Sequence, residues 1–247
     1  MIDILLLILK VLPFSLTYSF VSNYFYYFVI FQSKLGKRIF LKKKLYNHEP
    51  GHEEALKTFK QALLSETMFS TVFIAIINSN APILKTHVKV RWGLAAETWW
   101  IFLVEASVLF IINEIYHYTV HRNIHRRKVF KFFHVLHHSI RYPIPQSASV
   151  AQWTEQILFV IPFVVLLFCD VHIISILLFS VTIKFFSLIQ HSGHEFVPGH
   201  IREKFPFKYL NTASFHQVHH SVSMRHNYGF VTNILDRIFK TRYHQAE

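Results

Sequence analysis

Residues 98–127 read TWWIFLVEASVLFIINEIYHYTVHRNIHRR, an apolar stretch that runs directly into a series of histidines. The apolar part, 98–116, approaches the roughly 20 residues that a helix needs to cross a bilayer. His117, His121 and His125 follow at steps of four residues, so their side chains share one face if the helix continues. The stretch therefore predicts a membrane helix with a histidine-bearing end.

Three further apolar stretches cover residues 2–31, 68–84 and 157–190. The first lacks the small-residue cleavage pattern of a signal peptide and predicts a retained anchor helix. The last would extend about 51 Å as one helix, so it predicts a hairpin of two short or tilted helices that turns at Asp170 and His172. We therefore predict an all-α integral membrane protein with about four transmembrane helices and a cytosolic, histidine-rich helical cap.

The composition agrees with a membrane protein. Apolar residues make up 52% of the 247 residues and charged residues 16%, and the mean hydropathy of +0.29 is unusual for a soluble protein. The net charge of +12 lies in short basic runs between apolar stretches, which indicates membrane topology and no nucleic-acid partner. Six basic residues within 34–44 place 34–65 in the cytosol by the positive-inside rule, and the span count puts 117–155 and 191–247 on that side.

Histidine is concentrated in the second half of the chain, where 14 of the 18 lie between His117 and His226. Residues 134–138 read HVLHH and residues 216–220 read HQVHH, a spacing expected to bring three imidazoles to one side of a helix. A fourth group is the HSGHE of residues 191–195. Four such groups at the ends of apolar spans indicate a metal centre rather than a pH-sensitive or merely basic surface.

The histidines are too many for one ion, because a tetrahedral metal takes at most four ligands, so two metals are implied. The single cysteine, Cys169, excludes a cysteine-based zinc site. Carboxylates are scarce in the histidine groups, which argues against a Glu-rich di-iron bundle. Imidazole binds Fe, Zn, Cu and Ni, so the ligand type leaves the element open. Glu114 and Asp236 are candidates to accept imidazole N–H bonds behind the ligands, with ordinary surface salt bridges as the alternative.

At these residues the chain resembles the fatty acid hydroxylase and sterol desaturase superfamily of membrane di-iron enzymes. The resemblance covers 113–242: the H-R-x-x-H box is similar to 121–125, the two H-x-x-H-H boxes to 134–138 and 216–220, and H-S-G to 191–193. The sterol 4-methyl oxidase branch looks most similar because of Tyr116-His117-Tyr118 before the first box. His194 stands where that branch usually has Tyr, and Glu114 where it has Asp.

The resemblance implies a catalytic domain over 113–247 with the membrane hairpin 157–190, preceded by anchor helices and a basic cytosolic loop over 1–112. It implies two Fe ions as cofactors, with Zn as a substitute in a purified form. His117 stays outside the ligand set. The metal ligands that the resemblance implies are His121, His125, His134, His137, His138, His191, His194, His216, His219 and His220.

The implied activity is hydroxylation or desaturation of a lipid, a sterol, fatty acyl or sphingoid chain, with O2 and two electrons from a cytochrome b-type or ferredoxin donor. The membrane would be the endoplasmic reticulum in a eukaryote or the inner membrane in a bacterium, with the metals on the cytosolic side. Two alternatives remain open at this point. One is a bis-histidine haem electron-transfer membrane protein, and the other is a non-catalytic metal-binding membrane protein.

Overall fold

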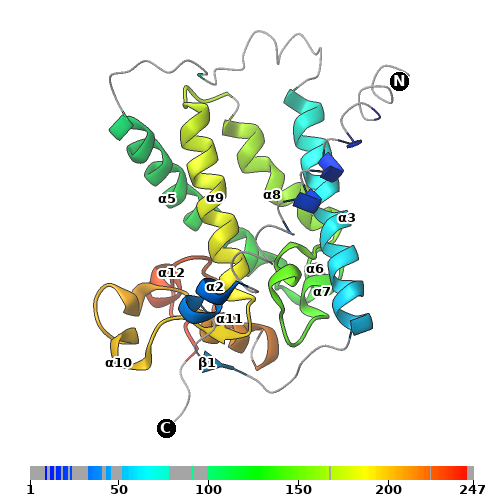
Figure 1. The fold of residues 1–247 in the computed structure, drawn as a ribbon. Helices are drawn as coiled ribbons and strands as arrows, with labels where there is room; N and C mark the ends of the chain where they lie inside the picture. Colours follow the sequence, from blue (N-terminus) through cyan, green and yellow to red (C-terminus); the bar gives the residue numbers. More distant parts are fainter. Residues whose placement is uncertain are drawn as a thin grey trace.

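A computed structural model describes residues 33–40, 43–45, 52–77, 91, 99–166, 168–222 and 224–243, with scattered positions between 9 and 23. The anchor predicted over 2–31 lies mostly outside the described residues, as does the second half of the stretch predicted over 68–84. The described chain is mostly helical, as the long apolar stretches predict. Figure 1 shows long helices in one half of the molecule and short elements gathered at one end of them.

Among the residues that the structure describes, the long half is a bundle of four helices: α3 (His52–Ile77), α5 (Trp99–Ile124), α8 (Trp153–Leu166) and α9 (Ile173–Gln190). α5 packs on α9 and α8, and α3 packs on α8. By length and composition, α5 and α9 are the two described helices able to cross a membrane, with mean hydropathies of 1.5 and 2.0. The count of about four spans therefore remains a prediction.

The predicted hairpin is present in the structure. α8 ends at Leu166 and α9 begins at Ile173, so the turn falls at the residues that the sequence singled out. The side chain of His172 caps α9 by accepting a hydrogen bond of 3.1 Å from the Ile174 backbone N–H, which satisfies a donor that a helix start leaves unpaired. The turn lies at the end of the bundle opposite the short elements (Figure 1).

The short elements form a cap at the other end of the bundle (Figure 1). After α5 come α6 (Arg127–Phe133), α7 (Val135–His138) and the 3-10 turn η2 (Pro145–Ser149). After α9 come β2 (His194–Glu195), α10 (Gly199–Arg202), η3 (Phe207–Tyr209), α11 (Ala213–Ser221) and α12 (Ile234–Ile238). α11 packs on α9 and β2. This contact brings the histidines of 216–220, on α11, close to those of 191–195, which follow the end of α9.

The basic run of the N-terminal half lies on the cap. It contains α2 (Lys34–Phe40) and the short strand β1 (Lys43–Lys44), which pairs antiparallel with β2 so that Lys43 faces Glu195 and Lys44 faces His194. The basic run and the histidine groups thus lie on the same side of the molecule, as the charge pattern predicts. Which side of a membrane that is remains a prediction.

Apolar and polar side chains are distributed differently over the long helices and the cap. The outer face of α5 is apolar and exposed, with Trp99 at 72% and Ile111 at 58% exposure, whereas Leu109 on the inner face packs with Ile176 and Phe179 of α9. The interior of the cap instead buries many imidazoles and carboxylates. An apolar exterior over two long helices is the surface expected to face lipid.

Candidate metal centre

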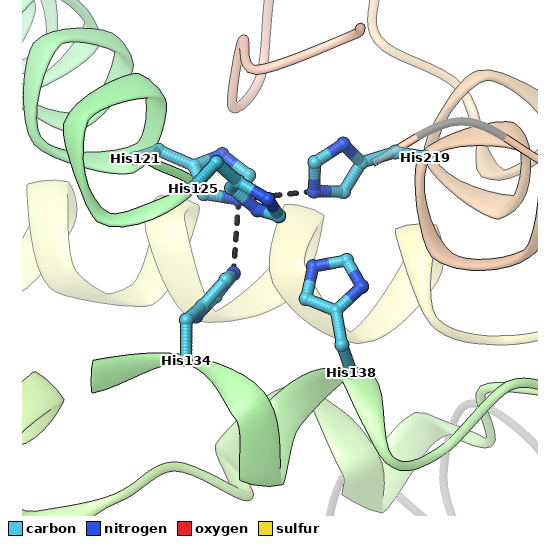
Figure 2. Close-up of side chains that lie close together, drawn as sticks. All are labelled: His121, His125, His134, His138 and His219. Carbon is cyan, nitrogen blue, oxygen red and sulfur yellow. Dashed lines mark hydrogen bonds between the residues drawn. The ribbon is translucent and has the colours of Figure 1, made fainter. Parts of the chain in front are cut away.

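Five histidines from three helical segments meet in the cap, in what we name the first cluster. Their imidazole nitrogens, one from each ring, all lie within 4.8 Å of one another. Figure 2 shows the rings pointing into a common space from the end of α5, from the region of α6 and α7, and from α11. The members are His121, His125, His134, His138 and His219.

Four more histidines form the second cluster, with nitrogens equally close together. α9 ends just before His191, so the buried end of a long apolar helix delivers this ring to the cap. α7 and α11 supply the other three. The members are His137, His191, His216 and His220.

Helix geometry decides which histidine joins which cluster. Residues four apart on a helix share a face, and His134 and His138 accordingly lie in the first cluster while His216 and His220 lie in the second. The three rings of each H-x-x-H-H motif do lie close together, but their nitrogens are divided between the two clusters instead of forming one ligand set. His137 contributes its nitrogen to the second cluster, although its ring stacks on that of His134 with centroids 4.9 Å apart.

The hydrogen bonds of the rings in the first cluster show which of their nitrogens carry lone pairs, and those lone pairs face one another. His121 donates from Nδ1 to the Tyr228 carbonyl at 2.9 Å, and His219 donates from Nδ1 to the His226 carbonyl at 2.7 Å. A neutral imidazole has one N–H, so both Nε2 atoms carry lone pairs. These Nε2 atoms lie 3.1 Å apart, where two lone pairs repel unless an ion lies between them.

The second cluster shows the same arrangement. His137 donates from Nδ1 to the Val150 carbonyl at 3.0 Å, and His191 donates from Nδ1 to the Ser187 carbonyl at 2.7 Å. Their Nε2 atoms face each other at 3.3 Å. Nitrogens bound at ~2.1 Å to one ion lie about 3–3.4 Å from one another, so both clusters have the spacing of ligand sets.

Burial keeps the rings in the form that binds metal. Desolvation lowers the pKa of His137 to about 4, despite the hydrogen bond to Val150, and lowers the pKa of His191 to about 3. Both imidazoles are therefore neutral at pH 7, as ligation requires. Among the described residues, His138 has both ring nitrogens buried without a hydrogen-bond partner, and a metal ion would satisfy one of them.

A carboxylate that sequence reasoning missed supports the first cluster. Glu155, in the first turn of α8, lies 2.7 Å from Nδ1 of His134, and both side chains are almost fully buried. An imidazole ligand commonly donates its second N–H to such a carboxylate, which fixes the ring. The only signal in the sequence was an acidic residue next to a long apolar stretch.

Glu114 and Asp236 act differently from the prediction, because the structure gives both of them backbone N–H and hydroxyl donors instead of imidazoles. Glu114 accepts bonds of 3.0 and 2.8 Å from the backbone N–H groups of Val231 and Thr232. Asp236 accepts bonds of 2.9 and 2.7 Å from those of Tyr228 and Gly229. The two carboxylates thus hold the backbone segment whose Tyr228 carbonyl orients His121. They support this candidate ligand through the backbone and not through a direct hydrogen bond to its ring.

His194 and His117 lie outside both clusters. The Nδ1 of His194 lies 2.9 Å from the carbonyl of Ser192, two residues earlier in the chain, so the structure does not bring this predicted ligand to the others. His117 packs its ring against Phe159 and Phe230, with ring centroids 5.3 and 4.6 Å away. The exclusion of His117 from the ligand set therefore stays a prediction, and the structure places this ring beside the clusters and in neither of them.

Comparison with known proteins identifies the family of this chain. The model of the fatty acid hydroxylase family matches residues 106–241, more than half of the sequence and all nine clustered histidines. The chain belongs to the fatty acid hydroxylase family. No solved structure matches it.

The chain is also similar to curated proteins from other organisms. The chain is 28% identical over 157 residues to methylsterol monooxygenase 1-2 of Arabidopsis thaliana, an alignment that covers 62% of this chain and 52% of the relative. It is 31% identical over 146 residues to methylsterol monooxygenase 1 of Danio rerio, covering 58% and 48%. Fatty acid hydroxylase ahd1 of Mycosarcoma maydis is 34% identical over 136 residues, covering 54% and 32%. The chain thus spans about half the length of the methylsterol monooxygenases that it matches.

Proposed function

We propose that this chain is a membrane-bound di-iron oxygenase that hydroxylates or desaturates a lipid, using O2 and two electrons from a separate donor. The observation that carries the proposal is the pair of histidine clusters, in which hydrogen bonds to backbone carbonyls fix lone pairs toward common centres. The family match supports the choice of iron. Two iron ions, when bound, would supply the activation of O2 and the removal of hydrogen from an unactivated C–H bond.

The chain's own residues hold and insulate the site. Carbonyls of Tyr228 and Val150 orient His121 and His137, and Glu155 orients His134, so each ring presents Nε2 inward. Nearly all clustered imidazoles are buried, which excludes water from an oxidising centre and keeps side reactions low. The protein contributes ligand geometry and exclusion of water, and the metal contributes the redox chemistry.

The position of the clusters favours a lipid substrate. They lie where α5 and α9 meet the cap, at the end of a bundle with an apolar outer surface. A lipid could enter from the bilayer and place one carbon near the metals without crossing water. Relatives named for methylsterols and fatty acids support a lipid, and the sterol, fatty acyl and sphingoid classes are the candidates to test.

The remaining parts of the proposal concern the surroundings of the enzyme. The electron donor would be a cytochrome b-type protein or a ferredoxin, which reaches the metals from the cytosolic side. The basic strand β1 beside β2 supports a cytosolic cap, because basic residues accumulate on that side of membranes. The host membrane would be the endoplasmic reticulum or a bacterial inner membrane.

A bis-histidine haem fits the geometry poorly. The axial nitrogens of such a haem lie on opposite sides of a porphyrin plane about 4 Å apart. Here the facing Nε2 atoms lie 3.0 to 3.3 Å apart, in two sets of four or more rings, with no room for a macrocycle. A Soret band in the purified protein would revive the haem alternative.

The decisive experiment combines metal analysis with lipid profiling. Cells expressing the wild type should accumulate a hydroxylated or unsaturated lipid, and the purified protein should contain about two irons per chain. His137→Ala should abolish the product, whereas His194→Ala, outside both clusters, should retain it. Unchanged lipid pools with two bound metals would instead support a non-catalytic metal-binding protein.

A further inference from the structure

Lys184 is the only charged residue of the apolar helix α9. A lysine within a helix of this hydropathy is costly to place in a membrane and normally has a partner and a role. Its ammonium group donates to Oε2 of Glu66 on α3 at 3.0 Å and to Oγ of Ser149 at 2.7 Å. The Lys184 side chain is 21% exposed and that of Glu66 is 13% exposed, so solvent screens this pair only weakly.

Ser149 connects this ion pair to the second cluster. It is the last residue of η2, and the next residue, Val150, is completely buried. The Val150 carbonyl is the group that accepts the Nδ1 hydrogen bond of His137. A bond from Lys184 to Ser149 therefore acts on the backbone one residue away from the acceptor that orients a candidate ligand.

The other neighbour of Val150 is held as well. The hydroxyl of Ser65, next to Glu66 on α3, donates to the Ala151 carbonyl at 3.0 Å and accepts from the Ala151 N–H at 3.3 Å. Val150 thus lies between two residues that α3 and α9 hold through side chains. α9 also delivers His191, seven residues or about two turns beyond Lys184 and on the same face.

We propose that Lys184, Glu66 and Ser65 act as positioning residues, a clamp that fixes the Val150 carbonyl and through it the His137 ring of the second metal ion. The proposal rests on the proposed function, because it assumes that each cluster holds an ion. The clamp acts on one ion only. The first cluster has separate supports in the carbonyls of Tyr228 and His226 and in the carboxylate of Glu155.

Selectivity for one ion is what distinguishes a clamp from general stabilisation of the bundle. Loss of a group that orients a ligand typically weakens metal binding 10–100-fold. Loss of packing or charge elsewhere in the bundle lowers the stability of the fold and affects the metal affinity of both clusters alike. The chain offers a matched control in Arg91, which forms an ion pair with Glu105 and Asp170 at the opposite end of α9.

The test uses the full chain, purified in detergent, stripped of metal and titrated with Co²⁺, whose visible absorption reports the ligand geometry. The wild type should bind two ions. Lys184→Met and Ser149→Ala should bind the ion of the first cluster normally and the other at least tenfold more weakly, and Lys184→Arg should recover much of the loss. Arg91→Met should bind both ions like the wild type.

Several outcomes would overturn the clamp. One is normal binding of both ions by Lys184→Met and Ser149→Ala, and another is equal weakening of both ions in these variants and in Arg91→Met. Ser149→Ala removes one hydroxyl and keeps the test valid if Lys184→Met fails to fold. A wild type that binds fewer than two ions would instead contradict the proposed function, a result visible before any variant is made.

Discussion

Glu155 lies 21 positions beyond His134 in the chain, yet its Oε1 is 2.7 Å from Nδ1 of that ring. The two side chains are 4% and 3% exposed, so the contact is sealed from water. Burial raises the pKa of Glu155 and lowers the pKa of His134. A cation bound at Nε2 of His134 would favour the charged carboxylate, which makes this pair a direct support of the first cluster.

Removal of the Glu155 carboxylate should therefore weaken one metal ion. We expect Glu155→Ala to lower the affinity of the first cluster by roughly 10–100-fold, because Nδ1 of His134 loses its acceptor in a buried site. The measurement is a Co²⁺ titration of the stripped protein. Glu53→Ala, at an exposed position in the first turn of α3, is the control and should leave the titration unchanged. Normal binding by Glu155→Ala would contradict the role of this pair.

Asp236 should matter for stability more than its small size suggests. Its carboxylate accepts from two backbone N–H groups and from the hydroxyl of Thr241, and it is completely buried. Asp236→Ala leaves these donors unpaired, so we expect a loss of about 3 kcal/mol in the free energy of unfolding. Thermal unfolding in detergent measures the change. Asp170→Ala, on a side chain that is 73% exposed, should change stability by about 1 kcal/mol or less.

Gly229 should tolerate no side chain. A Cβ at this position would lie 2.2 Å from the backbone oxygen of Thr232 and 2.7 Å from Oδ2 of Asp236. Backbone must move to relieve such a contact, so Gly229→Ala should destabilise the protein by about 2 kcal/mol or more. Gly199→Ala, where the added Cβ meets nothing within 4 Å, is the matched control. Equal stability of the two variants would show that the segment at Gly229 is not rigid.

Metal removal should destabilise the cap. Ions that bind the folded state and not the unfolded one raise stability, by about 4 kcal/mol at a thousandfold excess over Kd. We expect a chelator to lower the Tm of the wild type, and added Fe²⁺ to restore it under anaerobic conditions. His216→Ala/His220→Ala, which lacks two rings of the second cluster, should show a smaller drop. If the chelator leaves the Tm unchanged, the protein does not hold stabilising metal ions.

The single cysteine provides a native test of topology. Cys169 is partly exposed at the turn between α8 and α9, at the end of the bundle opposite the cap (Figure 1). If the cap is cytosolic, a membrane-impermeant maleimide should label Cys169 in intact spheroplasts. The matched variant Cys169→Ser with Lys44→Cys, on β1 beside β2, should react only after permeabilisation. The opposite pattern would invert the predicted orientation.

The sequence by itself determined the parts of this protein that depend on local spacing. Apolar length predicted α5 and α9, the excess length of 157–190 predicted a hairpin, and its turn lies where expected. Steps of four residues predicted that His121 and His125 act together, since the geometry of one helix is independent of the rest of the fold. Nine of the ten predicted ligands lie in the two clusters.

Only the tertiary structure decided how those histidines are divided. His137 and His138 are neighbours in the chain and enter different clusters, and His219 and His220 do the same. Spacing shows that adjacent residues point apart, but the partner that each one meets depends on how α7, α9 and α11 pack. The contacts of Glu155 and Lys184, and the backbone partners of Asp236, could not be predicted for the same reason. Hydrogen bonds between residues 8 to 118 positions apart form only when helices bring them together.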